Sequence, residues 1–244
     1  MPACTFGNRR HAGHMKRLGL LLVCGLAVRA ATAGEDLGAL VDKIAGAYGG
    51  RAALEKIAAV RETGRVEPAT RVGNSNPMVR TFARPLKLRV EVGDASKPTE
   101  VRVVDGATGW RNGKESTGEG YEAMVLQAVR LDLPFQLLSQ RKALVEKEPM
   151  DSQGKRLRVV ELRLEHDLAI IAGIDPETGR ILFSTGTTKA GSMTFETRYD
   201  DFRTVDDRLF AFKETNFAGG TKTAEIVLSK IELLKAAPPG AFKP

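Results

Sequence analysis

Two residue types that commonly build reactive sites are scarce in this chain of 244 residues, which has only 2 cysteines and 3 histidines. Both cysteines, Cys4 and Cys24, lie near the N-terminus, as do His11 and His14. His166 is therefore the one residue of these two types in the main part of the chain. This inventory argues against a zinc site, a cysteine nucleophile and a disulfide. We expect no metal and no cofactor.

The chain also lacks an apolar stretch near its N-terminus that is long enough to cross a membrane. Leu18 to Val28 is uncharged, but it has eleven residues where about 20 are needed. Lys16 and Arg17 precede it, and the small residues of Ala31-Thr32-Ala33 follow it. This order is typical of a cleaved export signal. We expect residues 1–33 to be removed between Ala33 and Gly34, and the mature protein to be periplasmic.

Cys24 offers an alternative, because a cysteine near an export signal can receive a lipid anchor. That processing needs small residues directly before the cysteine, whereas Leu22 and Val23 occupy those positions. The sequence therefore favours a soluble exported protein over a membrane-anchored lipoprotein.

The excess of positive charge belongs mostly to the presequence. The mature chain keeps 32 of the 37 lysine and arginine residues against all 30 acidic residues, so its net charge falls from +7 to +2. Nucleic-acid-binding domains carry a basic patch. A nearly neutral chain with interspersed signs excludes nucleic acid as an expected partner.

The mature chain begins with a helical pattern. Leu37, Leu40, Val41 and Ile44 recur at the spacing of one helix face, which predicts an amphipathic helix over 35–48. Two glycines follow, as at many helix C-termini. The sequence "RAALEKIAAV" predicts a second short helix.

After Val60 the period changes to two. "LKLRVEV" places Leu88 and Val90 on one face and charged residues on the other, and stretches such as "EVRVVD", "MTFETRYD" and "TKTAEIVLSKIELL" repeat the alternation. In "RLRVVELRL" the apolar phase shifts between Val159 and Val160, which predicts a β-bulge. Turn signals separate the runs. The pattern predicts about nine or ten antiparallel strands in one strongly curved sheet.

One segment interrupts the strands. Residues 119–144, "EGYEAMVLQAVRLDLPFQLLSQRKAL", have helix-forming composition with Pro134 in the middle. We expect two short helices with a bend, whose apolar side packs on the concave face of the sheet. The fold class is thus mainly β with helices (α+β), in a single domain over 34–244.

Four aspartates in "YDDFRTVDDRLFAF" raise the question of a metal or acid–base site. Asp206 and Asp207 fall where a hairpin must reverse, and Asp200 and Asp201 fall where a strand is expected to end, so turn and rim positions are favoured over a divalent-ion site or catalysis. Ser184 lacks the G-x-S-x-G elbow. We expect no catalytic residue and no enzymatic activity.

The order of these features resembles a known family. A leading helix ending in "YGG", then "DGATGW", a helical insertion, "YDDFRTVDDRLFAF", "AEIVLSKIELL" and a final "FKP" are similar to the LolA/LolB-like superfamily of bacterial envelope proteins, which includes outer-membrane lipoprotein-sorting proteins. The resemblance covers the whole mature chain. It implies a half-open antiparallel β-barrel with an N-terminal helix and a helical lid, and a cavity that holds acyl chains in the carriers.

The resemblance and the patterns together imply a non-enzymatic binding protein, monomeric, for a lipid or a lipoprotein acyl chain. The alternative is a regulatory or scaffolding module of the same fold that docks an envelope protein. Trp110 either lines the ligand pocket or anchors a hairpin. The expected cavity and lid residues are Leu88, Val90, Val101, Val103, Trp110, Met124, Val125, Val129, Leu133, Phe135, Leu138, Phe195 and Phe210.

Overall fold

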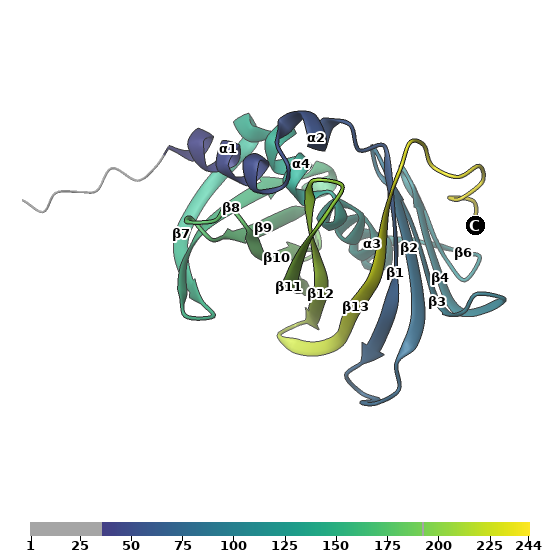
Figure 1. Ribbon diagram of the computed structural model, residues 1–244. Helices are drawn as coiled ribbons and strands as arrows, with labels where there is room; N and C mark the ends of the chain where they lie inside the picture. The colour runs from purple at the N-terminus through teal and green to yellow at the C-terminus, as the bar shows by residue number, and fades with distance from the viewer. Residues whose placement is uncertain (1–35, 192) are drawn as a thin grey trace, which may run out of the picture. The chain divides into compact units, whose positions relative to one another are not determined.

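The computed structural model describes residues 36–191 and 193–244. One antiparallel sheet of 13 strands forms most of it, in the order β6-β5-β4-β3-β2-β1-β13-β12-β11-β10-β9-β8-β7. The end strands β6 and β7 are not paired with each other, so the sheet is open (Figure 1). The predicted fold class is confirmed. The strands are β1 (Ala59–Pro68), β2 (Asn76–Ala83), β3 (Lys87–Asp94), β4 (Lys97–Asp105), β5 (Thr108–Arg111), β6 (Lys114–Ser116), β7 (Leu144–Ser152), β8 (Lys155–Arg163), β9 (Ala169–Ile174), β10 (Ile181–Thr187), β11 (Thr194–Val205), β12 (Arg208–Ala218) and β13 (Thr221–Leu234).

The helices follow the sequence pattern closely. The N-terminal helix and both helices of the insertion are present, and the bend falls at Asp132, two residues before Pro134. The second short helix ends earlier than expected, because Ala59 and Val60 already belong to β1. Within the described residues, no helix is long and apolar enough to cross a membrane. The helices are α1 (Leu37–Ala47), α2 (Arg51–Glu55), α3 (Gly118–Leu131) and α4 (Leu133–Ser139), with two short 3-10 turns, η1 (Arg141–Ala143) and η2 (Glu165–Asp167).

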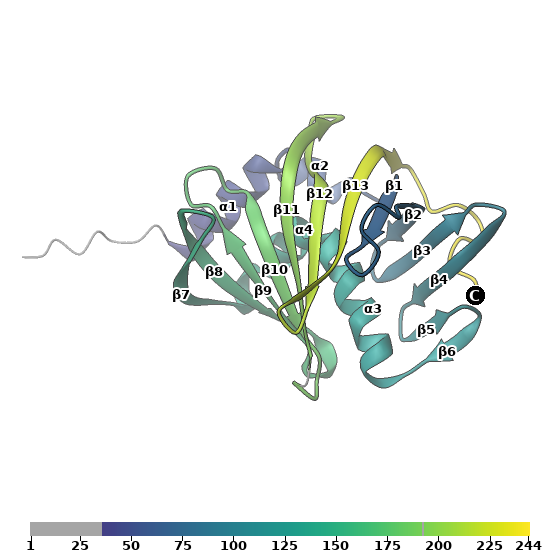
Figure 2. The same cartoon turned by 90° about the horizontal axis from the view of Figure 1, so that it is seen from below.

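The sheet curves around the insertion. Both views place α3 between one arm made of β2–β6 and a second arm made of β7–β10, with β11, β12, β13 and β1 joining the arms (Figures 1 and 2). Leu126 on α3 is buried in the main core, and so are Leu88 on β3 and Ile170 on β9. The apolar side of the insertion therefore fills the concave face of the sheet.

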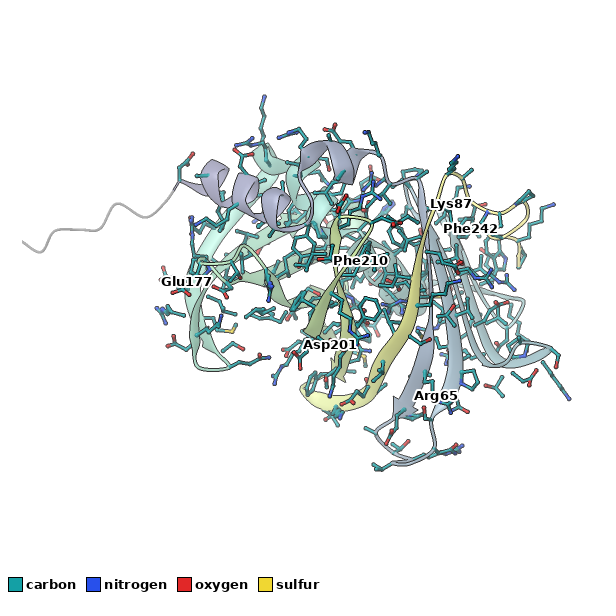
Figure 3. The ribbon with its side chains drawn as sticks, in the orientation of Figure 1. Arg65, Lys87, Glu177, Asp201, Phe210 and Phe242 are labelled. Atoms are coloured by element: carbon teal, nitrogen blue, oxygen red, sulfur yellow. The ribbon has the colours of Figure 1, made fainter. Side chains whose placement is uncertain are left out.

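A second, smaller core lies on the other face of the first strands. Val103 of β4 and Phe242 of the C-terminal segment are buried together with Ala59 and Ala83, and Trp110 packs against them. Figure 3 shows Phe242 beside Lys87 at the β2–β6 arm, away from Phe210. The C-terminal segment thus covers apolar side chains that would otherwise face water.

Two local predictions are wrong. The pairing of β8 with β9 runs without a shift through Val159 and Val160, and the irregularity lies in β7 between Lys147 and Met150. Val159 and Val160 are both buried because both faces of β8 are covered. The sheet also has more strands than expected, since β5 and β6 have only four and three residues and give no clear alternation.

Candidate functional site

An open cleft with a volume of about 1030 Å³ runs along the side of α3. Tyr121, Val125 and Val129 lie four residues apart on α3 and form an apolar stripe in the cleft. Leu86 lines it from the β2–β6 arm, and Leu168 lines it from the connection between β8 and β9. Because β6 and β7 are unpaired, nothing in the sheet closes this space.

Polar contacts fix α3 to the β2–β6 arm. The Tyr121 hydroxyl donates a hydrogen bond to the carbonyl oxygen of Gly106, at 2.9 Å, in the turn between β4 and β5. Gly109 allows the close approach, since a Cβ atom there would lie 2.8 Å from the Tyr121 ring and 2.9 Å from Met124. This wall of the cleft is therefore well defined.

The opposite wall is held by charged groups on the loops of the other arm. The Lys189 backbone N–H donates to the Glu122 carboxylate at 3.0 Å, and the Lys189 ammonium lies 3.4 Å from Asp167. The Thr188 hydroxyl donates to Glu119 at 3.3 Å. Rim charges of both signs thus surround an apolar floor.

A smaller pocket of about 80 Å³ lies on the other side of the insertion. Leu54 and Ile57, from α2 and the residues after it, face Leu133 of α4 across it. Leu209 and Phe210 of β12 complete its apolar walls. Phe210 lies near the middle of the curved sheet in Figure 3.

The base of this pocket is ionic. Arg80 of β2 pairs with Glu62, directly opposite it on β1, and its two terminal nitrogens donate to both oxygens of Glu214 on β12. All three side chains are buried. Burial raises the pKa of Glu62, and the neighbouring Glu214 adds to this rise although Arg80 opposes it. The pKa of Arg80 is also raised, because the two carboxylates outweigh the effect of its burial.

Two further polar residues reach the same interior. Arg130 of α3 and Tyr199 of β11 line the pocket of about 80 Å³ and an adjoining one of about 20 Å³. The Tyr199 and Ser184 hydroxyls are 2.7 Å apart, and burial raises the pKa of Tyr199 to about 12. The interior beneath the insertion is therefore apolar at its walls and charged at its base.

Most of the expected cavity and lid residues come together. Seven are buried in the main core, and three pack against its edge. Among them, Val125 and Val129 line the cleft, whereas Leu133 and Phe210 line the small pocket. The buried seven are Leu88, Val90, Met124, Val125, Val129, Leu133 and Leu138, and the edge three are Phe135, Phe195 and Phe210.

Three expected wall residues lie elsewhere. Val101, Val103 and Trp110 belong to the second core with Phe242, on the opposite face of the sheet. The strand "EVRVVD" contains adjacent valines, so alternation alone does not fix its phase, and Val104 is the one that joins the main core. Ala33, Gly34 and Cys24 lie outside the described residues.

The charged interior was missed by the sequence analysis, although a signal exists. Arg80 lies between Met78 and Phe82 in the inward phase of β2, and Glu214 follows Phe210 and Phe212 in the inward phase of β12. A charge in the buried phase of a strand needs a partner. Among the described residues, no group of three or more His, Cys, Asp or Glu side chains could hold a metal ion.

No family model matches the sequence, and no curated protein matches it. Solved structures do match the fold. A domain assigned to the outer membrane lipoprotein-sorting proteins of Vibrio parahaemolyticus is 10% identical, with a TM-score of 0.53, over 76% of this chain and 89% of that one. A LolA superfamily protein from Nitrosomonas europaea is 11% identical, with a TM-score of 0.54, over 84% of this chain and 96% of that one.

A DUF1329 family protein from Desulfovibrio piger has the same fold, with 8% identity and a TM-score of 0.56 over 86% of this chain and 98% of that one. At these identities the likeness describes architecture alone. The open curved sheet is thus similar in fold to a lipoprotein-sorting domain and to a LolA superfamily protein, as the sequence resemblance implied.

Proposed function

We propose that this protein is an exported, non-enzymatic binding protein that holds an apolar chain, such as a lipid or a lipoprotein acyl chain, in the cleft along α3. The observation that carries the proposal is the cleft itself. Its volume of about 1030 Å³ reaches the upper end of ligand sites, roughly 300–1,000 Å³. Its floor is the apolar stripe of Tyr121, Val125 and Val129.

The sizes of the two spaces beside the insertion indicate where the acyl chain would bind. The pocket beneath it, at about 80 Å³, is far smaller than a site for a whole lipid. The cleft is larger and already open. An acyl chain binds through non-directional apolar contacts, which this floor supplies. The mixed charges at the rim would stay in water beside the ligand's polar end.

The fold and the N-terminal sequence support an envelope role. Two structural neighbours carry the names of lipoprotein-sorting and LolA superfamily proteins. The predicted export signal, with Lys16 and Arg17 before the apolar stretch and a cleavage site after Ala33, would deliver the chain to the periplasm. A part in outer-membrane lipoprotein sorting is the specific form of this proposal.

The test uses uptake of a fluorescent fatty-acid probe by the purified mature protein. Ala107 lines the cleft from the exposed turn between β4 and β5. Ala95 is an exposed alanine in the turn between β3 and β4 and does not line the cleft. Ala107→Trp should block probe uptake, whereas Ala95→Trp should leave it unchanged. Equal uptake by both variants would show that the acyl chain binds outside this cleft.

The alternative is a docking module for an envelope protein. It is favoured by the space beneath the insertion, which the insertion's own side chains reduce to a small pocket. If the wild-type protein takes up no apolar probe, the chain-binding proposal fails and this alternative stands.

A further inference from the structure

Arg130 has no carboxylate partner among the described residues, unlike three other arginines that are largely withdrawn from solvent. Arg80 is bonded to two glutamates, Arg84 to Asp132, and Arg102 lies 3.4 Å from Glu100. Within the described part of the chain, Arg130 donates one hydrogen bond, from Nη1 to the carbonyl oxygen of Phe195 at 3.3 Å, and forms no ion pair within 4.0 Å. A guanidinium group has five N–H donors, so most of its capacity is unused.

The position of Arg130 makes its lack of a carboxylate partner unusual. Arg130 is partly buried and lines both the pocket of about 80 Å³ and the adjoining one of about 20 Å³. Burial lowers the pKa of Arg130, while Tyr199 and Glu214 nearby oppose that effect and Arg80 reinforces it. A buried charge without a bonded partner is costly. A guanidinium aimed into a pocket therefore points to a negatively charged ligand.

The acidic groups at the base of the pocket do not satisfy Arg130. Both oxygens of Glu214 already accept hydrogen bonds from Arg80, and Glu62 is bonded to the same arginine. Those bonds also leave few acceptors for a cationic ligand. Arg208 also lines the larger pocket, where it donates to the carbonyl oxygen of Ala53. Arg130 is the arginine that lines both pockets, so it is the cation best placed for a ligand there.

We propose that Arg130 binds the carboxylate of a small monocarboxylic acid with a short apolar group, held in the small pocket beneath the insertion. The planar guanidinium fork matches a carboxylate, which it can bind with two parallel hydrogen bonds. Leu131, Ile57 and Phe210 supply apolar walls for the rest of the ligand. The volume of about 80 Å³ selects a small molecule rather than a lipid.

This site is separate from the proposed chain-binding cleft. On α3, Val125 and Val129 line the cleft, whereas Arg130 and Leu131 line the two small pockets. The two spaces share no lining residue. The proposed carboxylate site therefore does not depend on acyl-chain binding in the cleft, and either proposal can fail without the other.

The first experiment compares head groups on the wild-type protein by isothermal titration calorimetry. Propanoate should bind with one site per chain, and 1-propanol, which has the same tail without the charge, should bind at least about tenfold more weakly, as expected for the loss of hydrogen bonds to a charged group. Propylamine should not bind. Equal binding of propanoate and propanol, or no binding of propanoate at millimolar concentration, would overturn the proposal.

The second experiment uses variants. Arg130→Gln should weaken propanoate binding by about tenfold or more, and Arg130→Lys should weaken it less, because lysine keeps the charge but not the fork. Arg89→Gln is the matched control: it removes another partly buried guanidinium, one that lines neither pocket, and should leave propanoate affinity unchanged. An equal loss in both glutamine variants would indicate a general structural effect and contradict the proposal. Ala107→Trp should leave propanoate binding intact, which separates this site from the cleft.

Discussion

The guanidinium of Arg84 and the carboxylate of Asp132 form a two-point ion pair, with Nε 2.6 Å from Oδ2 and Nη2 2.7 Å from Oδ1. Asp132 is the residue between α3 and α4. Arg84 also donates to the carbonyl oxygen of Leu54 at 2.8 Å, and its guanidinium stacks 3.4 Å from the centre of the Phe135 ring. One side chain thus joins the end of β2, α2 and the bend of the insertion.

Replacing Asp132 with asparagine should release this junction. Asp132 is buried and Arg84 is mostly buried, so removing the charge of one partner leaves the other poorly compensated. We expect Asp132→Asn to lower the free energy of unfolding by about 3 kcal/mol. Amides of α3 and α4 should also exchange faster with solvent in hydrogen-exchange measurements.

The control is another two-point pair, Arg203 with Asp201, whose side chains are 54% and 38% exposed. Asp201→Asn should change stability by about 1 kcal/mol or less. If the two asparagine variants lose the same stability, the Arg84–Asp132 pair does not hold the insertion.

The sequence was sufficient to predict the architecture where one physical pattern dominated. The alternation around Leu88 and Val90 identified β3, and the helical composition of residues 119–144 identified the insertion and its bend. The sequence did not predict which side chains face the insertion where both faces of a strand are covered. Val103 and Val104 are both buried, because the C-terminal segment covers one face and the insertion covers the other. No local pattern reveals that distant cover.

The candidate site was less predictable. Val125 and Val129 were identified as lid residues, and they line the cleft. The buried pairing of Glu62, Arg80 and Glu214 joins residues far apart in the sequence, and only the strand order brings them together. Their position in the inward phase of strands marks them as unusual, but it does not identify their partners.

The raised pKa of Glu62 predicts a pH-dependent effect on stability. The folded state binds this proton more tightly than the unfolded state, in which the pKa of a glutamate is about 4.5. The contribution of Glu62 therefore favours folding most below that value and is lost as the pH rises through the raised pKa. Glu62→Gln removes the titration, so urea midpoints should shift in favour of the variant as the pH rises above about 4.5 and through the raised pKa.

Glu161 provides a control in which the pH dependence of stability has the opposite sign. Hydrogen bonds from Lys147 and Arg163 lower its pKa, so its contribution is lost as the pH falls. Glu161→Gln should therefore become less favourable, relative to the wild type, as the pH rises. A Glu62→Gln difference that stays constant with pH would show that Glu62 ionises as it does in the unfolded chain.

The hairpin between β11 and β12 explains one pair of aspartates. Val205 pairs with Arg208, so Asp206 and Asp207 form a two-residue loop, and their φ angles are 47° and 62°. Positive φ at both positions is typical of a type I′ turn, which favours Asn, Asp and Gly. The expected turn at these residues is confirmed. The expected strand end at Asp200-Asp201 is wrong, because β11 continues past Asp201, which is left unpaired with φ 50°.

Substitutions at Asp207 should follow backbone conformation rather than charge. Asp207→Gly should keep or increase stability, whereas Asp207→Val should cost about 1–2 kcal/mol, because a β-branched residue is strained at positive φ. Thermal unfolding measures both. A chelator should leave the wild-type melting temperature unchanged. A melting temperature that rises by many degrees on adding calcium would contradict the turn interpretation.

The last prediction concerns the C-terminal segment, which covers the second core. Phe242 is buried against Val103, and the segment is held by a hydrogen bond from Arg89 to the carbonyl oxygen of Lys243, at 2.9 Å. Phe242→Ala should lower the free energy of unfolding by about 3 kcal/mol, the lower end of the range for such changes. Trp110 is the only tryptophan of the chain and packs against the same core, so its emission should shift to longer wavelength in the folded variant. Phe212→Ala, in the main core, should cost similar stability without moving the emission. Unchanged emission in Phe242→Ala would mean that the segment does not shield this face of the sheet from water.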